Sequence, residues 1–191
     1  MRKRTLFLTM TAAALAAAIG ATSAPAQETP HAGYRETGSS QDWVGIYSPD
    51  RGTGERTASC AIYSRPVDTA VFQDGEPVEI IRGELAAYIA WNARTPSREF
   101  GEISFVMGAP IREGRDVGHT LTVDGQTSFD LVGINDRLYV MPADDAEALS
   151  AVQRGFDMVV TAITEDGRVI KDTYSLRGIL RMTDVSAEEC R

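Results

Sequence analysis

The segment HTLTVDGQTSFDLV, residues 119–132, decides the predicted fold. Apolar residues alternate with polar ones on both sides of the dipeptide Asp124-Gly125. Alternation with a period of two is typical of a β-strand with one buried face. An Asp-Gly pair between two such runs is among the strongest short-range signals for a β-hairpin. The segment therefore predicts two antiparallel strands that meet at this turn.

Strand signals of this kind occur about eight times along the chain. A second hairpin is predicted around Asp166-Gly167, and its second strand is expected to run through KDTYSLRGILRM, residues 171–182. Trp43 is expected to lie in the core. Segments 48–58 and 67–84 lack this periodicity and are predicted to be a loop and an irregular excursion. Further strands are predicted at 42–47, 59–66, 85–92, 100–107 and 137–142.

One helix is predicted in ADDAEALSAVQRG, residues 143–155. Asp144 or Asp145 lies near its start, apolar residues follow at helical spacing, and Gly155 is a stop signal. Strands joined by tight turns, without alternating βαβ units, indicate an all-β fold. The sequence therefore predicts an antiparallel β-sandwich, or a partly open barrel, of about eight strands with one short helix near 144–154.

The N-terminal residues are typical of an export signal. Three basic residues at positions 2–4 precede an apolar run, and an A-x-A cleavage pattern occupies 24–26. We therefore predict a secretory signal peptide over 1–26, a disordered leader over 27–41 and a single β domain over 42–191. No later stretch approaches the roughly 20 apolar residues of a membrane helix, so no integral membrane span is expected.

The chain is acidic. Its formal net charge is −8, and removal of the three basic residues in the signal would make it −11. Such a domain lacks the basic surface by which proteins bind nucleic acid, so no nucleic-acid partner is expected. The charge instead favours a cationic partner.

The two cysteines, Cys60 and Cys190, are predicted to form a disulfide. An even number of cysteines in an exported protein favours a disulfide, and two cysteines allow one pairing. The closed loop of about 130 residues would add roughly 5 kcal/mol through loss of chain entropy in the unfolded state. A redox-active pair is the alternative, but the C-x-x-C pattern typical of such pairs is missing.

The sequence offers little for metal binding or catalysis. Its two histidines are His31, in the leader, and His119, where the first hairpin begins. No further histidine or free cysteine stands at ligand spacing, so neither a metal nor another cofactor is predicted. His119 is expected to be a half-exposed strand residue. Glu99 and Glu102 form an acidic pair that is interpreted as solvated surface.

Asp172 interrupts the apolar row of its predicted strand. As a catalytic base it would act beside Tyr174 and Ser175. Adjacent strand residues point to opposite faces, however, so Tyr174 and Ser175 do not readily serve one reaction centre. The favoured interpretation is structural: Asp172 lies at the mouth of the sandwich and accepts hydrogen bonds from the backbone or from nearby hydroxyls.

Several motifs resemble the invasion-associated locus B family of bacterial exported proteins. They are an export signal, "DW" at 42–43, a cysteine in a strand that ends "SRP", "MGAP", "LTVDGQTSFDL", "DAEALSAVQRGFDMVV", "DTYSLRGI" and a terminal cysteine. The resemblance covers most of residues 42–190. It implies a periplasmic or outer-membrane-associated all-β domain, with a part in host-cell invasion among pathogenic relatives. It implies no established enzymatic activity and no catalytic residues.

Three functions follow as hypotheses. The first is a non-enzymatic binding or envelope module that uses loops 48–58 and 67–84 to bind a cationic surface or peptide. The second is a hydrolase of unrecognised type that uses His119 with Asp172 or another nearby acid. The third is an accessory protein that pairs an uncovered sheet edge with strands of client proteins.

Overall fold

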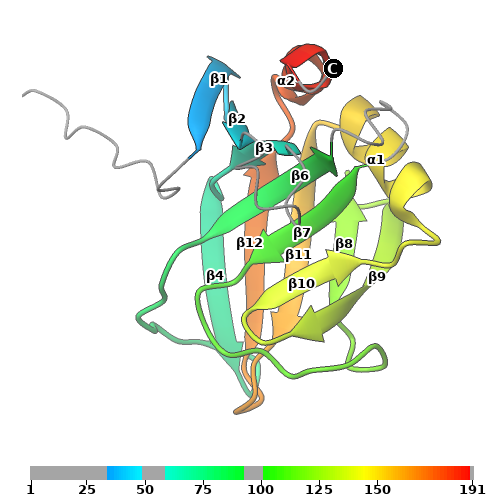
Figure 1. Cartoon of the computed structure of the whole chain (residues 1–191). Coiled ribbons are helices and arrows are strands. Elements are labelled where there is room, and N and C mark those ends of the chain that lie inside the picture. Colours follow the sequence, from blue (N-terminus) through cyan, green and yellow to red (C-terminus); the bar gives the residue numbers. More distant parts are fainter. Residues whose placement is uncertain (1–33, 49–58, 93–100, 190–191) are drawn as a thin grey trace, which may run out of the picture. The chain divides into compact units, whose positions relative to one another are not determined.

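The computed structural model describes residues 34–48, 59–92 and 101–189, all within one compact unit that spans 33–191 (Figure 1). The predicted signal peptide and most of the predicted leader lie outside the described residues. Among the residues described, no helix is long and apolar enough to cross a membrane.

Twelve antiparallel strands form one open sheet in the described part of the chain. Their order is β1-β2-β3-β6-β7-β10-β9-β8-β11-β12-β4-β5. The prediction of an antiparallel all-β fold is confirmed, whereas eight strands was too few. The strands are β1 (Arg35–Ser40), β2 (Trp43–Ser48), β3 (Ser59–Ser64), β4 (Asp68–Gln73), β5 (Glu76–Pro77), β6 (Ala86–Asn92), β7 (Glu102–Val106), β8 (Thr120–Val123), β9 (Thr127–Ile134), β10 (Arg137–Val140), β11 (Asp157–Ile163) and β12 (Val169–Ser175).

Strand β9 belongs to both halves of the sheet. Its first residues pair with β8 and its last residues pair with β10. The sheet folds over at this strand, so that β12 lies across the core from β7, and the rings of Phe105 and Tyr174 lie 6.0 Å apart. Inward side chains from both halves form one apolar core around Trp43, which is fully buried as predicted.

Both predicted Asp-Gly hairpins are present, and the structure adds a third. Asp124-Gly125 joins β8 to β9, and the turn containing Asp166-Gly167 joins β11 to β12. Segment 67–84 was predicted to be irregular, but its first half is the β4–β5 hairpin around Asp74-Gly75. Both turn residues have positive φ, which suits a two-residue hairpin turn. The same dipeptide signal was therefore present there and was missed.

The chain has two described helices rather than one. Helix α1 (Asp145–Arg154) matches the prediction. Helix α2 (Ile179–Glu189) begins within the segment 171–182 that was predicted to be a strand, so its first four residues were predicted to continue β12. The apolar positions after Gly178 fit both periods over a short window, but the buried residues of α2 follow the helical one: Ile179, Met182, Thr183, Ser186 and Ala187. Helix α2 packs on β1, β2 and β3 (Figure 1).

Gly178 ends the strand at a close backbone approach. Its φ is +92°, and a Cβ there would lie 2.1 Å from the carbonyl oxygen of Ser40. Only glycine fits both the left-handed backbone and this contact. Beside it, the indole nitrogen of Trp43 donates a hydrogen bond of 3.0 Å to the carbonyl of Ser175. The stretch that starts at Asp172 is therefore fastened to the beginning of the sheet.

Strand β1 lies inside the segment predicted to be a disordered leader. Arg35–Ser40 pairs with β2, and the Arg35 guanidinium forms an ion pair with Glu189 of α2 at 2.8 Å. The prediction that order starts at residue 42 was wrong. The sequence of β1, RETGSS, is polar because it is an edge strand that buries little, so its strand character comes from pairing and not from local pattern.

Candidate functional site

Asp172 forms a buried ion pair with Arg82. The Asp172 side chain is fully buried, and the Arg82 side chain is 6% exposed. Two guanidinium nitrogens contact the two carboxylate oxygens at 2.7 and 2.6 Å. This paired geometry is the strongest that an arginine and a carboxylate can form. Asp172 therefore has a structural partner, and this partner is an arginine and not the backbone or hydroxyl groups that were predicted.

The partner comes from the segment that links β5 to β6, residues 78–85, which we call the strap. Arg82 also donates to the carbonyl of Met107 from Nε at 2.9 Å and from Nη2 at 2.6 Å. One side chain thus ties the strap to β12 and to the end of β7. The strap is further held by a hydrogen bond of 2.7 Å from the Gly83 N–H to the Gly108 carbonyl. These contacts fix one wall of the cleft described below.

His119 is buried and engaged by the main chain on both sides. Its Nε2 lies 2.7 Å from the Arg112 carbonyl, and its Nδ1 accepts a hydrogen bond of 3.1 Å from the Ile163 N–H. Because a carbonyl only accepts and an amide only donates, these partners assign the ring hydrogen to Nε2. The prediction of a half-exposed His119 was wrong, since the residue fixes a loop that precedes β8.

The structure does not bring His119 and Asp172 together as a base and an acid. His119 contacts Arg112 and Ile163, whereas Asp172 contacts Arg82. A general base needs a free nitrogen within reach of the proton that it removes. Both nitrogens of His119 are occupied by backbone groups, so this pair cannot perform the proposed hydrolysis in the described conformation.

Tyr174 lies in the core next to the ion pair and does not extend toward a site. It is fully buried, and its hydroxyl has no hydrogen-bond partner among the described residues. Burial is the main cause that raises the pKa of this phenol, and the Asp172 carboxylate raises it further. Ser175 has its hydroxyl at 3.3 Å from the Arg177 N–H, so the two side chains do not meet at one centre.

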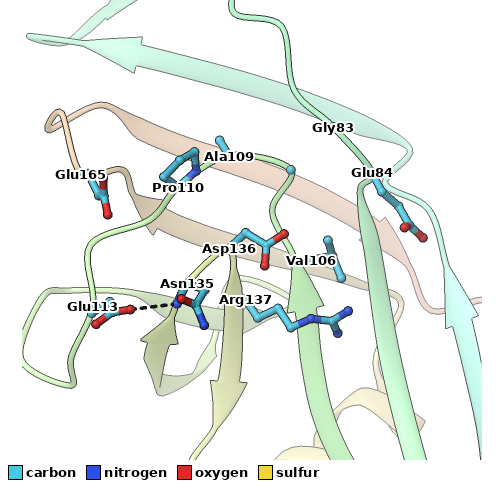
Figure 2. A pocket seen from close by; sticks show the side chains of 11 residues that line it. Gly83, Glu84, Val106, Ala109, Pro110, Glu113, Asn135, Asp136, Arg137 and Glu165 are labelled. Atoms are coloured by element: carbon cyan, nitrogen blue, oxygen red, sulfur yellow. Dashed lines mark hydrogen bonds between the residues drawn. The ribbon is translucent and has the colours of Figure 1, made fainter.

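A cleft of about 560 Å³ opens at the rim of the sheet, between the strap and the β9–β10 turn (Figure 2). Its floor contains Val106 and the Gly108–Pro110 segment of the MGAP motif. Gly108 has a φ of +63°, and a Cβ there would lie 2.8 Å from the Glu84 carbonyl, so glycine is required for this packing. The remaining lining residues are Gly83, Glu84, Glu113, Asn135, Asp136, Arg137 and Glu165.

The cleft is acidic. Four carboxylates line it, and none of them forms an ion pair within the described part of the chain. Glu113 accepts a hydrogen bond from the Asn135 N–H at 3.2 Å, and Glu84 lies 3.1 Å from the Tyr88 hydroxyl. The one guanidinium, Arg137, extends away from Glu113 in Figure 2 and lies 6.0 Å from the centre of the Tyr88 ring. The cleft therefore carries an excess of unpaired negative charge.

The acidic residues noted in the sequence lie elsewhere. Glu99 is outside the described residues. Glu102 is exposed on β7, where its charge adds to burial in raising the pKa of Asp145, at the start of α1, to about 6. Asp124 accepts backbone hydrogen bonds from Phe156 and Asp157. Asp124 therefore supports a turn, and neither Asp124 nor Glu102 lines the cleft. In the described ranges, no group of three or more histidine, cysteine or acidic residues could hold a metal ion.

Cys60 is buried in β3 and is not a free thiol. Cys190 lies outside the described residues and directly follows α2, which packs on β3. That packing supports the predicted Cys60–Cys190 disulfide, which stays a prediction. Of the predicted binding loop 48–58, Ser48 ends β2 and residues 49–58 lie outside the described residues. The other predicted binding loop, 67–84, contributes Gly83 and Glu84 to the cleft.

Sequence reasoning missed Arg82 and the cleft. A lone carboxylate in an apolar strand indicates a buried cationic partner. That partner, Arg82, is 90 residues away in the sequence, and the residues around it do not distinguish it from the other arginines. The four acidic residues of the cleft come from four separate loops or loop ends, and no spacing in the sequence connects them. Comparison of the chain with protein-family models, curated proteins and solved structures found no match, so the resemblance to the invasion-associated locus B family remains a prediction.

Proposed function

We propose that this protein is an exported, non-enzymatic binding module of the cell envelope that holds a cationic group in its acidic cleft. The cleft would sit on a rigid β-sandwich, or partly open barrel, in the periplasm or at the outer membrane. The sequence of residues 1–26 supports export. The resemblance to the invasion-associated locus B family supports an envelope role, including contact with host cells in pathogenic relatives.

The observation that carries the proposal is a preformed cleft with four carboxylates, none of which has an ion-pair partner among the described residues. Preformed hollows with a few converging polar groups are the usual form of ligand sites. Here the walls are fixed by the Arg82 contacts and by the Gly83–Gly108 hydrogen bond, so binding needs little ordering of the chain. A ligand with positive charge would gain from pairing with carboxylates that form no ion pair with any described residue.

A binding role is favoured over hydrolysis by the state of the expected catalytic groups. His119 has both ring nitrogens on backbone groups, and Asp172 is paired with Arg82. Among the described residues, the cleft lining contains carboxylates, an asparagine and an arginine but no serine, cysteine or histidine that could act as a nucleophile. The groups available there suit charge recognition and give no base–nucleophile pair.

The experiment is a titration of fluorescein-labelled tetralysine by fluorescence anisotropy. The full chain is expressed with residues 1–26 in place and purified from the periplasm, where intact mass reports removal of those residues and oxidation of the cysteines. We expect binding at low salt that weakens about 10-fold in the double variant Asp136→Asn/Glu165→Gln, about 0.7 kcal/mol for each lost charge. Labelled tetraglutamate serves as the ligand control.

The matched control variant is Glu147→Gln, which removes an exposed carboxylate from α1, outside the cleft. If Glu147→Gln weakens binding as much per charge as the cleft variants do, the ligand follows the overall charge and the proposed site is wrong. Failure of tetralysine to bind even at low salt would reject the cationic ligand. A chain that retains residues 1–26 and is found in the cytoplasm would reject export.

A further inference from the structure

The strap is an extended segment with alternating side chains, and no strand of the described ranges is hydrogen-bonded to its middle. Val78 and Ile80 pack against the core, and Arg82 points inward to Asp172. Ile81 between them is fully exposed, although it is a large aliphatic residue. The strap thus has the side-chain pattern of a strand while lying outside the sheet.

Its ends are fixed and its middle is unpaired. The Val78 N–H bonds to the Val71 carbonyl at 2.8 Å, and the Gly83 N–H bonds to the Gly108 carbonyl at 2.7 Å. Between these points, the main-chain groups of residues 79–82 form no hydrogen bond within the described part of the chain. Hydrogen-bonding groups of an extended chain alternate between its two edges. The N–H and C=O of Ile81 therefore point to the same side as those of Gly83, toward Gly108.

A second hollow, of about 270 Å³, lies on that side of the strap. Its lining has an apolar part, formed by Ile80, Ile81 and the Gly108–Pro110 segment, and a polar part, formed by Thr164, Glu165 and the ion pair of Asp166 with Arg168. Gly108, Ala109, Pro110 and Glu165 also line the acidic cleft, so the two hollows adjoin each other. Together the two hollows form a groove. One end has aliphatic side chains along the open main-chain edge of the strap and the Asp166–Arg168 ion pair in its lining, and the other end is acidic, with Glu84, Glu113 and Asp136.

The shape of this groove selects among cationic ligands. No three acidic groups of the described residues converge as a metal site, so a single small ion does not match the spread of charge. A ligand must reach along the groove and offer positive groups at one end. A peptide in extended conformation can also pair its own N–H and C=O groups with the open edge, as in β-strand addition.

We propose that the groove binds an extended peptide, which pairs as an added strand with the strap around Ile81 and places basic side chains in the acidic cleft. The inference deepens the proposed function and rests on it. Affinity comes from main-chain hydrogen bonds and the aliphatic contacts at Ile80 and Ile81, and the carboxylates select for lysine or arginine.

The test uses a labelled seven-residue peptide, valine-threonine-valine-threonine-lysine-alanine-lysine, and the full chain. Two N-methylated versions each block every second amide. Only one edge of an added strand faces the strap, so one version should bind about 10-fold more weakly and the other should bind as the parent does. Replacing the two lysines by glutamates should abolish binding. Ile81→Asp, at an exposed position, should weaken binding of the parent peptide without lowering the melting temperature of the protein.

The outcomes separate this inference from the proposed function. If both N-methylated peptides bind with the same affinity, and the double variant Asp136→Asn/Glu165→Gln binds the parent peptide more weakly, strand pairing is overturned and the cleft remains a cation site. If the cleft variants bind the peptide as strongly as the wild type does, both the strand pairing and the proposed function are overturned. Light scattering before the titration tests whether a second copy of the chain occupies the open edge. A dimer that dissociates in Ile81→Asp would assign the edge to that second copy and overturn the proposal of peptide binding.

Discussion

The Arg82–Asp172 pair gives the sharpest test of how this fold is held together. Replacing Asp172 by asparagine leaves the Arg82 charge at a side chain that is 6% exposed, and replacing Arg82 by methionine leaves the Asp172 charge at a side chain that is 0% exposed. Removing one partner of such a pair typically costs about 3–5 kcal/mol, because the remaining charge keeps its desolvation penalty and loses its counter-charge. Arg82→Met also leaves the Met107 carbonyl without its two donors.

The assay is urea unfolding followed by the fluorescence of the two tryptophans, which are both buried. With a slope of about 2 kcal/mol per molar urea, the expected loss corresponds to a midpoint lower by about 1.5–2.5 M. The double variant Arg82→Met/Asp172→Leu removes both charges, and replacement of a buried pair by apolar residues is often close to neutral. The double variant should therefore be more stable than either single variant, with a coupling energy of about 3 kcal/mol or more.

Arg82→Lys keeps the charge but loses the planar fork, so its cost should fall between those of the wild type and Arg82→Met. Two single variants that each cost less than about 1 kcal/mol and simply add in the double variant would refute the reasoning. The charge pair would then contribute little, and the strap would be held by its apolar and backbone contacts alone.

Four further predictions address other parts of the fold. Gly178→Ala should lower the free energy of unfolding by about 3 kcal/mol or more, because it adds a Cβ at positive φ against Ser40. The control Gly125→Ala, also at positive φ but in open space, should lower it by about 1 kcal/mol in the same urea assay. Tyr174→Phe should change stability by less than about 1 kcal/mol or increase it, because the hydroxyl is buried without a partner among the described residues. A loss above about 2 kcal/mol in thermal melting would show that the hydroxyl does form a stabilising hydrogen bond. The pKa of Asp145 is raised to about 6 from its ordinary 3.8, mainly by burial, so this group favours the folded state increasingly as pH falls from about 7 to 4. Asp145→Asn should therefore raise the melting temperature at pH 8 and leave it unchanged near pH 4. Thiol titration should find both cysteines blocked without reductant, and reduction should lower the melting temperature; two reactive thiols with an unchanged melt would reject the disulfide.

The sequence predicted the parts of the fold that depend on neighbouring residues. The Asp-Gly turns, the strands that they join and helix α1 are set by local pattern and turn chemistry. Strand β1 was missed because an edge strand acquires its structure from pairing, and α2 was missed because a few apolar residues fit both periods.

The candidate site was less predictable than the fold. Asp172 was noticed as an anomaly, but Arg82 comes from a segment predicted to be irregular. The cleft combines loop residues that become neighbours only after the sheet has folded over at β9. The order of the strands brings these carboxylates together. In a twelve-strand sheet that order depends on contacts between residues far apart in the sequence, which a local pattern does not reveal.

The pairing of β4 with β12 constrains how the chain reaches its native state. Thr69 pairs with Asp172, and the whole β4–β12 ladder joins segments about 100 residues apart. By contrast, β8, β9 and β10 pair with their immediate neighbours in the sequence, so their meander can form first and quickly. A chain emerging from the ribosome holds β4 without its partner until nearly all residues have been made. The β4–β5 hairpin would remain exposed for that time, and completion of the sheet would be the slow step of folding.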